Sequence, residues 1–116
     1  MIRILLLGFA LVIAAAGGAY AQDKTVYGFV GKSCGEWQEH RTAKDVGSAQ
    51  FQAYVDGFLS GYNMASYSPD LLAATPNDKG VSLYIWIDNY CRDKPLNVLS
   101  QALMALKQAL LARPQR

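Results

Sequence analysis

Two cysteines, Cys34 and Cys91, constrain the fold of this chain most, because they could form a bridge, a metal site or a catalytic site. The N-terminus indicates the compartment. Residues 1–21 combine a basic Arg3, an apolar run and a small-residue ending, Ala-Tyr-Ala, which is typical of a cleavable secretory signal peptide. Cleavage leaves 116 − 21 = 95 residues. We therefore expect a periplasmic protein, with no later segment long enough to span a membrane.

In an oxidising compartment the two cysteines are expected to form a disulfide. A metal site lacks ligands, because His40 is the only histidine and neither cysteine belongs to a Cys-x-x-Cys pair. The chain-entropy model gives a bridge between positions so far apart about 4 kcal/mol of stabilisation. That is a large share of the stability of a small domain, typically about 5–15 kcal/mol.

The residues after position 32 have helical periodicity, which predicts one all-α domain of four helices over residues 33–113. An extended arm is expected over residues 22–32. Ser33 and Glu36 match the Ser-x-x-Glu capping box, so the first helix should begin there and run to about Ala43. Trp37 shares a helix face with Cys34, which places its indole beside the bridge.

The second predicted helix covers residues 48–65 and carries two stripes. The first is apolar, with the spacing of a buried face: Phe51, Tyr54, Val55, Phe58, Leu59 and Tyr62. The second consists of small residues four apart: Ala49, Ala53, Gly57, Gly61 and Ala65. A glycine inside a helix costs about 1 kcal/mol relative to alanine, so we expect another helix to pack closely on Gly57 and Gly61. The polar Asp56 and Asn63 argue against a membrane helix here.

Two more helices are predicted after an irregular connection over residues 66–80, in which one short helical turn is expected at 70–74. The third helix should run from about Asn77 to Arg92. Its apolar side chains, Trp86 and Tyr90 among them, leave little polar face, so we expect it at the centre of the domain. Pro95 separates it from a fourth helix over residues 95–112. The bridge would then tie the first helix to the corner between the third and fourth.

Charge and motifs argue against several functions. Eleven basic and nine acidic residues are mixed along the chain, and losing Arg3 takes the formal charge from +2 to +1, so no nucleic-acid-binding stripe exists. His40 has no nucleophile nearby, and a paired-carboxylate site of Glu36 and Asp88 is disfavoured because Glu36 serves as a cap. No phosphate-binding loop or serine elbow occurs. We expect no enzyme and no cofactor, with a small hydrolase as a remote third hypothesis.

Four segments, "SCGEW", "YVDGFLSGYN", "WIDNYC" and "KPLNVLSQAL", occur in this order after the leader. Together they resemble the Tai-type immunity family, small periplasmic proteins that protect bacteria against type VI secretion amidase effectors and belong to a wider HdeA-like group. The similarity covers most of residues 33–110. Its most specific parts are Gly57 with the run over 60–63, which includes Gly61 and Asn63, and the segment from Trp86 to Pro95. Lys94 stands where members often have asparagine.

The resemblance implies a four-helix fold with the Cys34–Cys91 bridge, and a function in which the protein occludes the active site of a cell-wall amidase. The alternative is an HdeA-like acid-stress chaperone, although few titratable groups are available for a pH switch. A protein partner is expected, without nucleic acid, and a homodimer is left open.

The connection over residues 66–80 is the predicted partner-binding segment, because functional residues concentrate on loops held by a rigid scaffold. The expected contact residues are Tyr67, Asp70, Leu71, Leu72, Asn77, Asp78 and Lys79. The competing interpretation is that Leu71 and Leu72 only cover the core.

Overall fold

The computed structural model describes residues 27–67, 70–73, 75, 77–78 and 80–113. The predicted signal peptide (1–21), residues 22–26 of the arm and Lys79 lie outside these ranges. The elements follow in the order η1 (Phe29–Gly31), α1 (Cys34–Ala43), α2 (Val46–Ala65), α3 (Val81–Asp93) and α4 (Leu99–Leu111). The described residues contain no β-strand, so the prediction of a four-helix, all-α fold is confirmed.

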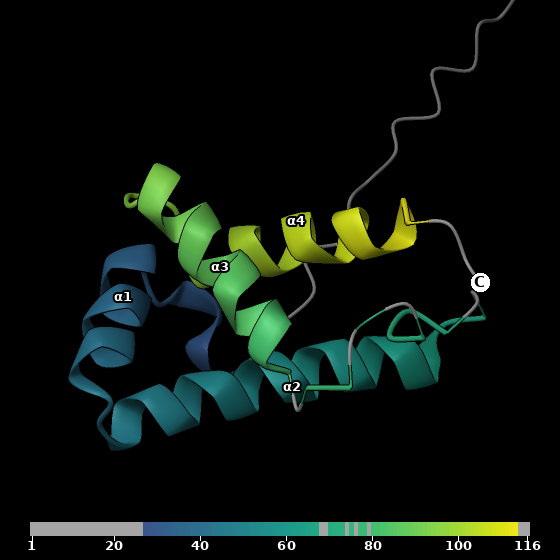
Figure 1. Cartoon of the computed structure of the whole chain (residues 1–116), viewed down its shortest axis with the longest axis horizontal. Coiled ribbons are helices and arrows are strands. Elements are labelled where there is room, and N and C mark those ends of the chain that lie inside the picture. Colours follow the sequence, from purple (N-terminus) through teal and green to yellow (C-terminus); the bar gives the residue numbers. More distant parts are fainter. Residues whose placement is uncertain (1–26, 68–69, 74, 76, 79, 114–116) are drawn as a thin grey trace, which may run out of the picture.

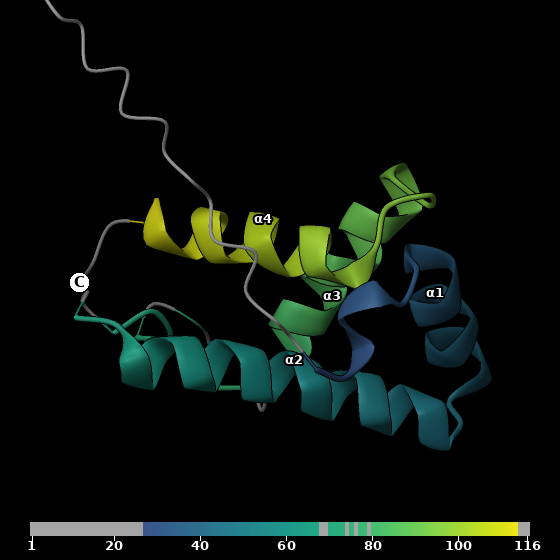
Figure 2. The ribbon, with the colours of Figure 1, turned by 180° about the vertical axis from the view of Figure 1, so that it is seen from behind.

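The longest helix, α2, lies along one side of the domain and α4 along the opposite side, with α3 crossing between them and α1 closing one end (Figure 1). The reverse view shows η1 beside α1, in the space between α2 and α4 (Figure 2). The α1 helix packs against α2 and α3, α3 packs against α4, and η1 contacts α4. All four helices contribute to one core, whose largest fully buried side chains include Trp37, Phe51, Ile87 and Leu103. Each such burial stabilises the fold by about 1.5–3 kcal/mol.

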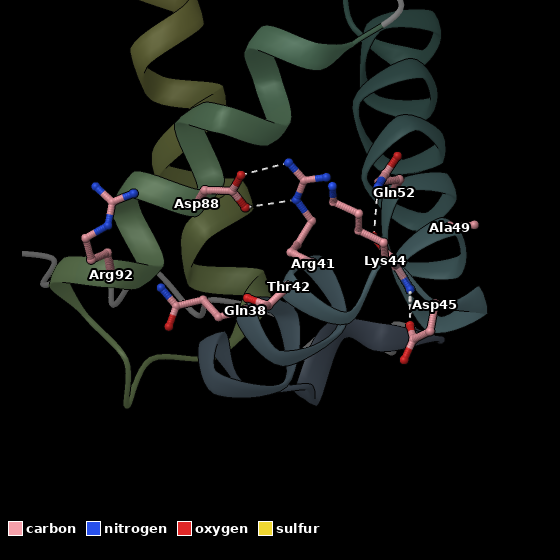
Figure 3. A pocket seen from close by; sticks show the side chains of 10 residues that line it. Gln38, Arg41, Thr42, Lys44, Asp45, Ala49, Gln52, Asp88 and Arg92 are labelled. Carbon is pink, nitrogen blue, oxygen red and sulfur yellow. Dashed lines mark hydrogen bonds and ion pairs between the residues drawn. The ribbon is translucent and has the colours of Figure 1, made fainter.

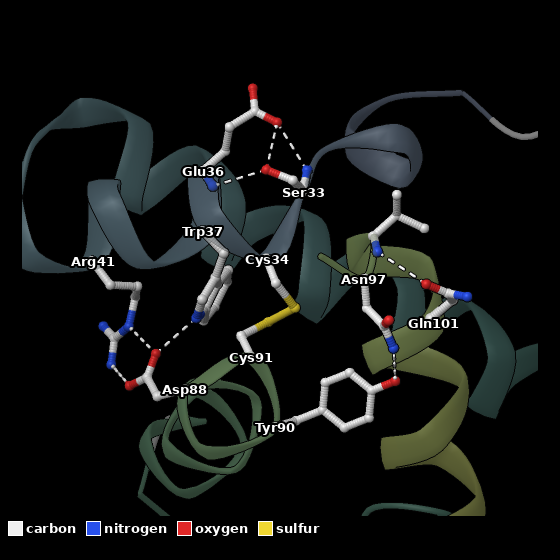
Figure 4. Close-up of a disulfide and its surroundings, with 11 residues drawn as sticks. Ser33, Cys34, Glu36, Trp37, Arg41, Asp88, Tyr90, Cys91, Asn97 and Gln101 are labelled. Atoms are coloured by element: carbon white, nitrogen blue, oxygen red, sulfur yellow. Dashed lines mark hydrogen bonds and ion pairs between the residues drawn. A yellow bond between two sulfur atoms is a disulfide. The ribbon is translucent and has the colours of Figure 1, made fainter. Parts of the chain in front are cut away.

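The predicted disulfide is confirmed. Cys34 and Cys91 are joined with their Cα atoms 4.9 Å apart, and both residues are fully buried. The bridge connects the first residue of α1 to the last turn of α3, with the Trp37 indole beside it (Figure 4). The predicted capping box is also present, because Glu36 N–H donates to Ser33 Oγ at 3.0 Å and Ser33 N–H donates to Glu36 Oε2 at 2.8 Å.

The fourth helix begins at Leu99, later than the predicted Pro95. The reason is a pair of backbone hydrogen bonds between this segment and the end of the arm. Cys34 N–H donates to the Asn97 carbonyl at 2.8 Å, and Leu99 N–H donates to the Lys32 carbonyl at 2.7 Å. This isolated antiparallel bridge holds residues 97–98 out of the helix. The described part of the arm is also less extended than predicted. It contains the 3-10 turn η1, and only Lys32 after it has an extended backbone.

The third helix begins at Val81, where the sequence predicted about Asn77. Gly80 has φ = +84°, a left-handed conformation that ends the preceding turn and cannot continue into a right-handed helix. The Asp78 carboxylate then caps the helix, because its Oδ2 accepts the Ser82 N–H at 2.9 Å. Where a short helical turn was predicted at 70–74, residues 71–73 form a turn that is not helical, and residue 74 lies outside the described ranges. Although α3 lies between α1 and α4, Val81 and Ile85 are each about half exposed, so one face of this apolar helix is open.

The predicted close packing on Gly57 and Gly61 is wrong. Both glycines are exposed, and a Cβ added at either position would meet nothing within 4 Å. The whole small-residue stripe of α2 faces outward, because the adjacent stripe that includes Phe51, Val55 and Leu59 is the one that enters the core. Four-residue spacing marks a helix face but does not say which of two neighbouring faces is buried.

Candidate functional site

An open groove of about 750 Å³ lies where α1, the beginning of α2 and the last turns of α3 meet (Figure 3). All but one of its lining residues are polar or charged: Gln38, Arg41, Thr42, Lys44, Asp45, Ser48, Ala49, Gln52, Asp88 and Arg92. A wall of this composition suits a polar or charged ligand, because an apolar one would leave the wall's donors and acceptors unpaired.

At the centre of the groove Arg41 of α1 pairs with Asp88 of α3 (Figure 3), and the fully buried Trp37, which is not part of the lining, binds the same carboxylate (Figure 4). Arg41 binds Asp88 through two parallel hydrogen bonds, Nε to Oδ1 at 3.0 Å and Nη2 to Oδ2 at 2.8 Å. Trp37 Nε1 donates to the same Oδ1 at 2.7 Å. The Arg41 guanidinium also lies over the rings of Trp37 and Tyr84, at 5.6 and 5.8 Å. The hydrogen bonds that Arg41 donates to Asp88 raise the pKa of Arg41, so this group is charged and held in one position.

One edge of the groove is the corner between α1 and α2. Asp45 caps α2, because its Oδ1 accepts the Ser48 N–H at 3.0 Å, and both of its oxygens lie 2.9 Å from His40 Nδ1. The hydrogen bond from His40, followed by that from Ser48, lowers the pKa of Asp45. His40 is half-buried, with its ring 5.5 Å from that of Phe51.

Gly47 makes this corner sterically feasible. It is buried in the first turn of α2, and a Cβ there would lie 2.6 Å from His40 Cε1 and closer still to Nδ1. Only a residue without a side chain allows His40 to reach Asp45. Gly47 was not predicted as a functional residue, although a glycine two residues after a helix-capping aspartate is the signal that could have identified it.

Two cations complete the lining. Lys44 is the last residue before Asp45 and has a left-handed backbone with φ = 52°. Arg92 lies on α3 and donates from Nη1 to Asn89 Oδ1 at 2.9 Å. Within the part of the chain that the structure describes, neither of them forms an ion pair. The groove therefore has two carboxylates that are both engaged and an excess of positive charge.

The predicted partner-binding segment is mostly engaged in holding itself to the domain. Leu71 is buried in the core, so its side chain is not available as a contact residue, and the partly exposed Leu72 packs against the core. Asn63 fixes this turn from α2, donating to Asp70 at 2.8 Å and accepting the Leu71 N–H at 2.7 Å. The hydrogen bond from Asn63 is the main cause of a lowered pKa at Asp70.

The other predicted contact residues differ in exposure and in their hydrogen bonds. Asp78 caps α3 through its Oδ2, and its role as a contact residue stays a prediction. Tyr67 is fully exposed and Asn77 is exposed, so the structure leaves them accessible. Their side chains do not lie in the groove's lining.

The remaining structural residues lie at the corner between α3 and α4. The rings of Trp86 and Tyr90 stack at 5.7 Å, and Lys94 Nζ lies 4.8 Å from the Tyr90 centroid. Asn97 Nδ2 donates to the Tyr90 hydroxyl at 2.8 Å (Figure 4). Pro95 lies in the turn between Lys94 and Asn97. These contacts fix the corner to which the disulfide also attaches.

A second polar link joins α2 and α3. The Tyr84 hydroxyl donates to Asp56, with both carboxylate oxygens at 2.7 Å. Burial of the phenol and then its hydrogen bond to Asp56 raise the pKa of Tyr84 to about 12. Asp56 therefore contributes to α2–α3 packing.

The carboxylates considered for catalysis do not form one site. Glu36 is engaged with Ser33 and with Lys32 Nζ at 2.9 Å, whereas Asp88 belongs to the network at the centre of the groove. Among the described residues, no group of three or more His, Cys, Asp or Glu side chains could hold a metal ion.

Comparison of the chain with protein-family models, with curated proteins and with solved structures found no match. No helix within the described ranges is long and apolar enough to cross a membrane.

The groove was not predicted from the sequence, although a signal was present. Trp37 and Arg41 follow Cys34 by three and seven residues, and Asp88 precedes Cys91 by three. Residues three, four or seven apart share a helix face. A bridge between the two helices therefore brings these side chains together.

Proposed function

We propose that this protein is a periplasmic immunity protein that binds a peptidoglycan amidase and blocks its active site. The observation that carries the proposal is the rigid polar groove beside the buried disulfide, which offers charged contacts to a protein. The disulfide itself supports an oxidising compartment, and the leader-like residues 1–21 support export. The four-segment resemblance to Tai-type proteins supports the class of target.

The test is inhibition of purified enzyme. The mature chain, beginning at Gln22, is titrated against a panel of type VI secretion amidases while the release of soluble fragments from peptidoglycan is measured. A cognate amidase should lose its activity at a stoichiometric amount of the protein and remain active with the reduced, alkylated form. Binding without inhibition would contradict active-site occlusion.

The exposed Tyr67 gives a second measurement on the same complex. If the loop contributes to binding, Tyr67→Ala weakens inhibition, whereas Gln108→Ala, at an exposed position on α4, leaves it unchanged. Equal inhibition by both variants would place the contact elsewhere on the domain.

An acid-stress chaperone is the second candidate, and one observation favours it. Glu36, Asp45 and Asp70 each cap a helix or fix a turn, and each has a lowered pKa. Their protonation would loosen the domain and expose apolar faces. A chaperone should suppress the aggregation of an unfolded client at pH 3 and not at pH 7, as measured by light scattering. Loss of structure at pH 3 without suppression would count against it.

A further inference from the structure

We propose that the groove binds the carboxylate side chains of an acidic segment on the partner protein. That the segment belongs to an inhibited enzyme rests on the proposed function. The binding chemistry itself follows from charges and donors in the groove.

The groove's own anions are already engaged. Asp88 accepts from Arg41 and from Trp37, while Asp45 accepts from Ser48 N–H and contacts His40. These carboxylates hold the helices together, and the three cations of the lining, Arg41, Lys44 and Arg92, leave the groove with a formal excess of one positive charge. An acidic segment would therefore meet positive groups more strongly than a basic one would.

The donors, by contrast, have spare capacity. A guanidinium carries five N–H donors, and the pair with Asp88 uses two of those on Arg41. Lys44 has an ammonium group that is not in an ion pair within the described residues, and Arg92 makes one hydrogen bond, to an uncharged amide. Carboxylates are the complementary ligands, because charge-assisted hydrogen bonds to them are the stronger ones.

The arrangement of the cations favours an extended segment over a small anion. Figure 3 shows Arg92 on one side of the Arg41–Asp88 pair and Lys44 on the other, projecting from different elements. They line a groove of about 750 Å³. A peptide with two or more carboxylates along its length offers a partner to the cation on each side of the pair.

The direct test uses ¹⁵N-labelled mature protein and an acetylated, amidated hexaglutamate peptide as the probe. The expected result is a set of amide shifts confined to residues 38–52 and 88–92, with binding that weakens as salt is added. A matched hexaglutamine peptide tests whether binding requires the negative charge or only the peptide backbone. A thymidine hexanucleotide tests whether the groove prefers carboxylates to phosphates. Equal affinity for either control, or no shifts with about 1 mM hexaglutamate, would overturn the proposal.

Two variants locate the binding site. Lys44→Gln and Arg92→Gln should each weaken hexaglutamate binding by about two- to fivefold, the range expected for an exposed ion pair. Arg113→Gln, at an exposed position after α4, is the matched control and should bind as wild type does. Each variant's spectrum reports whether the fold is intact. Wild-type affinity in both groove variants would overturn the proposal.

The same variants separate this inference from the proposed function. If hexaglutamate binds as expected but the protein inhibits no amidase, the groove proposal stands and the immunity function fails. If an amidase is inhibited equally by wild type, Lys44→Gln and Arg92→Gln, the immunity function stands and the groove is not where the enzyme's acidic segment docks.

Discussion

Trp37 on α1 donates its indole N–H to Asp88 on α3 at 2.7 Å, one helical turn from the disulfide that joins the same two helices (Figure 4). Arg41 binds the same carboxylate, so Asp88 accepts hydrogen bonds from both a buried indole and a guanidinium. The contact links the two helices and holds Asp88, which lines the groove, in place.

Replacing Asp88 by alanine should therefore destabilise the domain. The change leaves the indole N–H and the Arg41 charge without their acceptor, and hydrogen bonds to charged groups contribute about 1.5–3 kcal/mol. We expect the free energy of unfolding to fall by about 2 kcal/mol, measured by urea denaturation with tryptophan fluorescence. Asp93→Ala, at an exposed position of α3, is the control and should change stability little. Similar stability in the two variants would show that the network contributes nothing.

The disulfide should contribute more than any hydrogen bond. Replacing both cysteines by serine is expected to lower stability by about 2–5 kcal/mol, the usual range for a small secreted domain. Titration of the denatured, unreduced protein should detect no free thiols. Two reactive thiols, or a serine variant as stable as wild type, would contradict this expectation.

Two glycines of α2 should respond to alanine in opposite directions. Gly57 is exposed with open space around it, so Gly57→Ala should stabilise the protein by up to about 1 kcal/mol. At Gly47 the new Cβ would displace His40 from Asp45 and Phe51, so Gly47→Ala should destabilise by about 1–2 kcal/mol. Thermal unfolding of the two variants measures both effects. A stabilised Gly47→Ala protein would mean that His40 moves aside at little cost.

The glycines also show where the sequence was informative and where it was not. Local signals were sufficient to predict the start of α1, because the serine and glutamate of the capping box lie within one turn. The pairing of the disulfide was also predictable, because the sequence contains only two cysteines. The exposure of Gly57 depends instead on which side of α2 the other helices occupy. That choice is made by long-range packing, which four-residue spacing does not encode.

Long-range pairing also explains the later start of α4. Pro95 is a favourable first residue of a helix, but the hydrogen bonds from Cys34 and Leu99 fix the backbone after it in another conformation. The groove likewise depends on docking of α1, α2 and α3. Its charged residues lie together because the disulfide holds Arg41 of α1 opposite Asp88 of α3.

The final prediction is that stability falls as the solution becomes acidic, through three carboxylates. Hydrogen bonds from the Ser33 backbone and from Lys32 lower the pKa of Glu36 below its ordinary 4.5. Those from His40 and Asn63 lower the pKa values of Asp45 and Asp70, respectively, below 3.8. Since the unfolded chain binds these protons first, the stabilisation is complete above about pH 5 and is lost as the pH falls through the folded pKa values.

Thermal unfolding between pH 7 and pH 2 measures this loss. Asp45→Asn and Asp70→Asn remove one titrating group each, so each variant should be less stable than wild type at pH 7 and lose less stability on acidification. Asp93→Asn is the control, because this carboxylate is exposed and forms no ion pair within the described ranges. If both variants keep the wild-type pH dependence, the contacts of Asp45 and Asp70 do not control the acid response, and the observation favouring a chaperone is weakened.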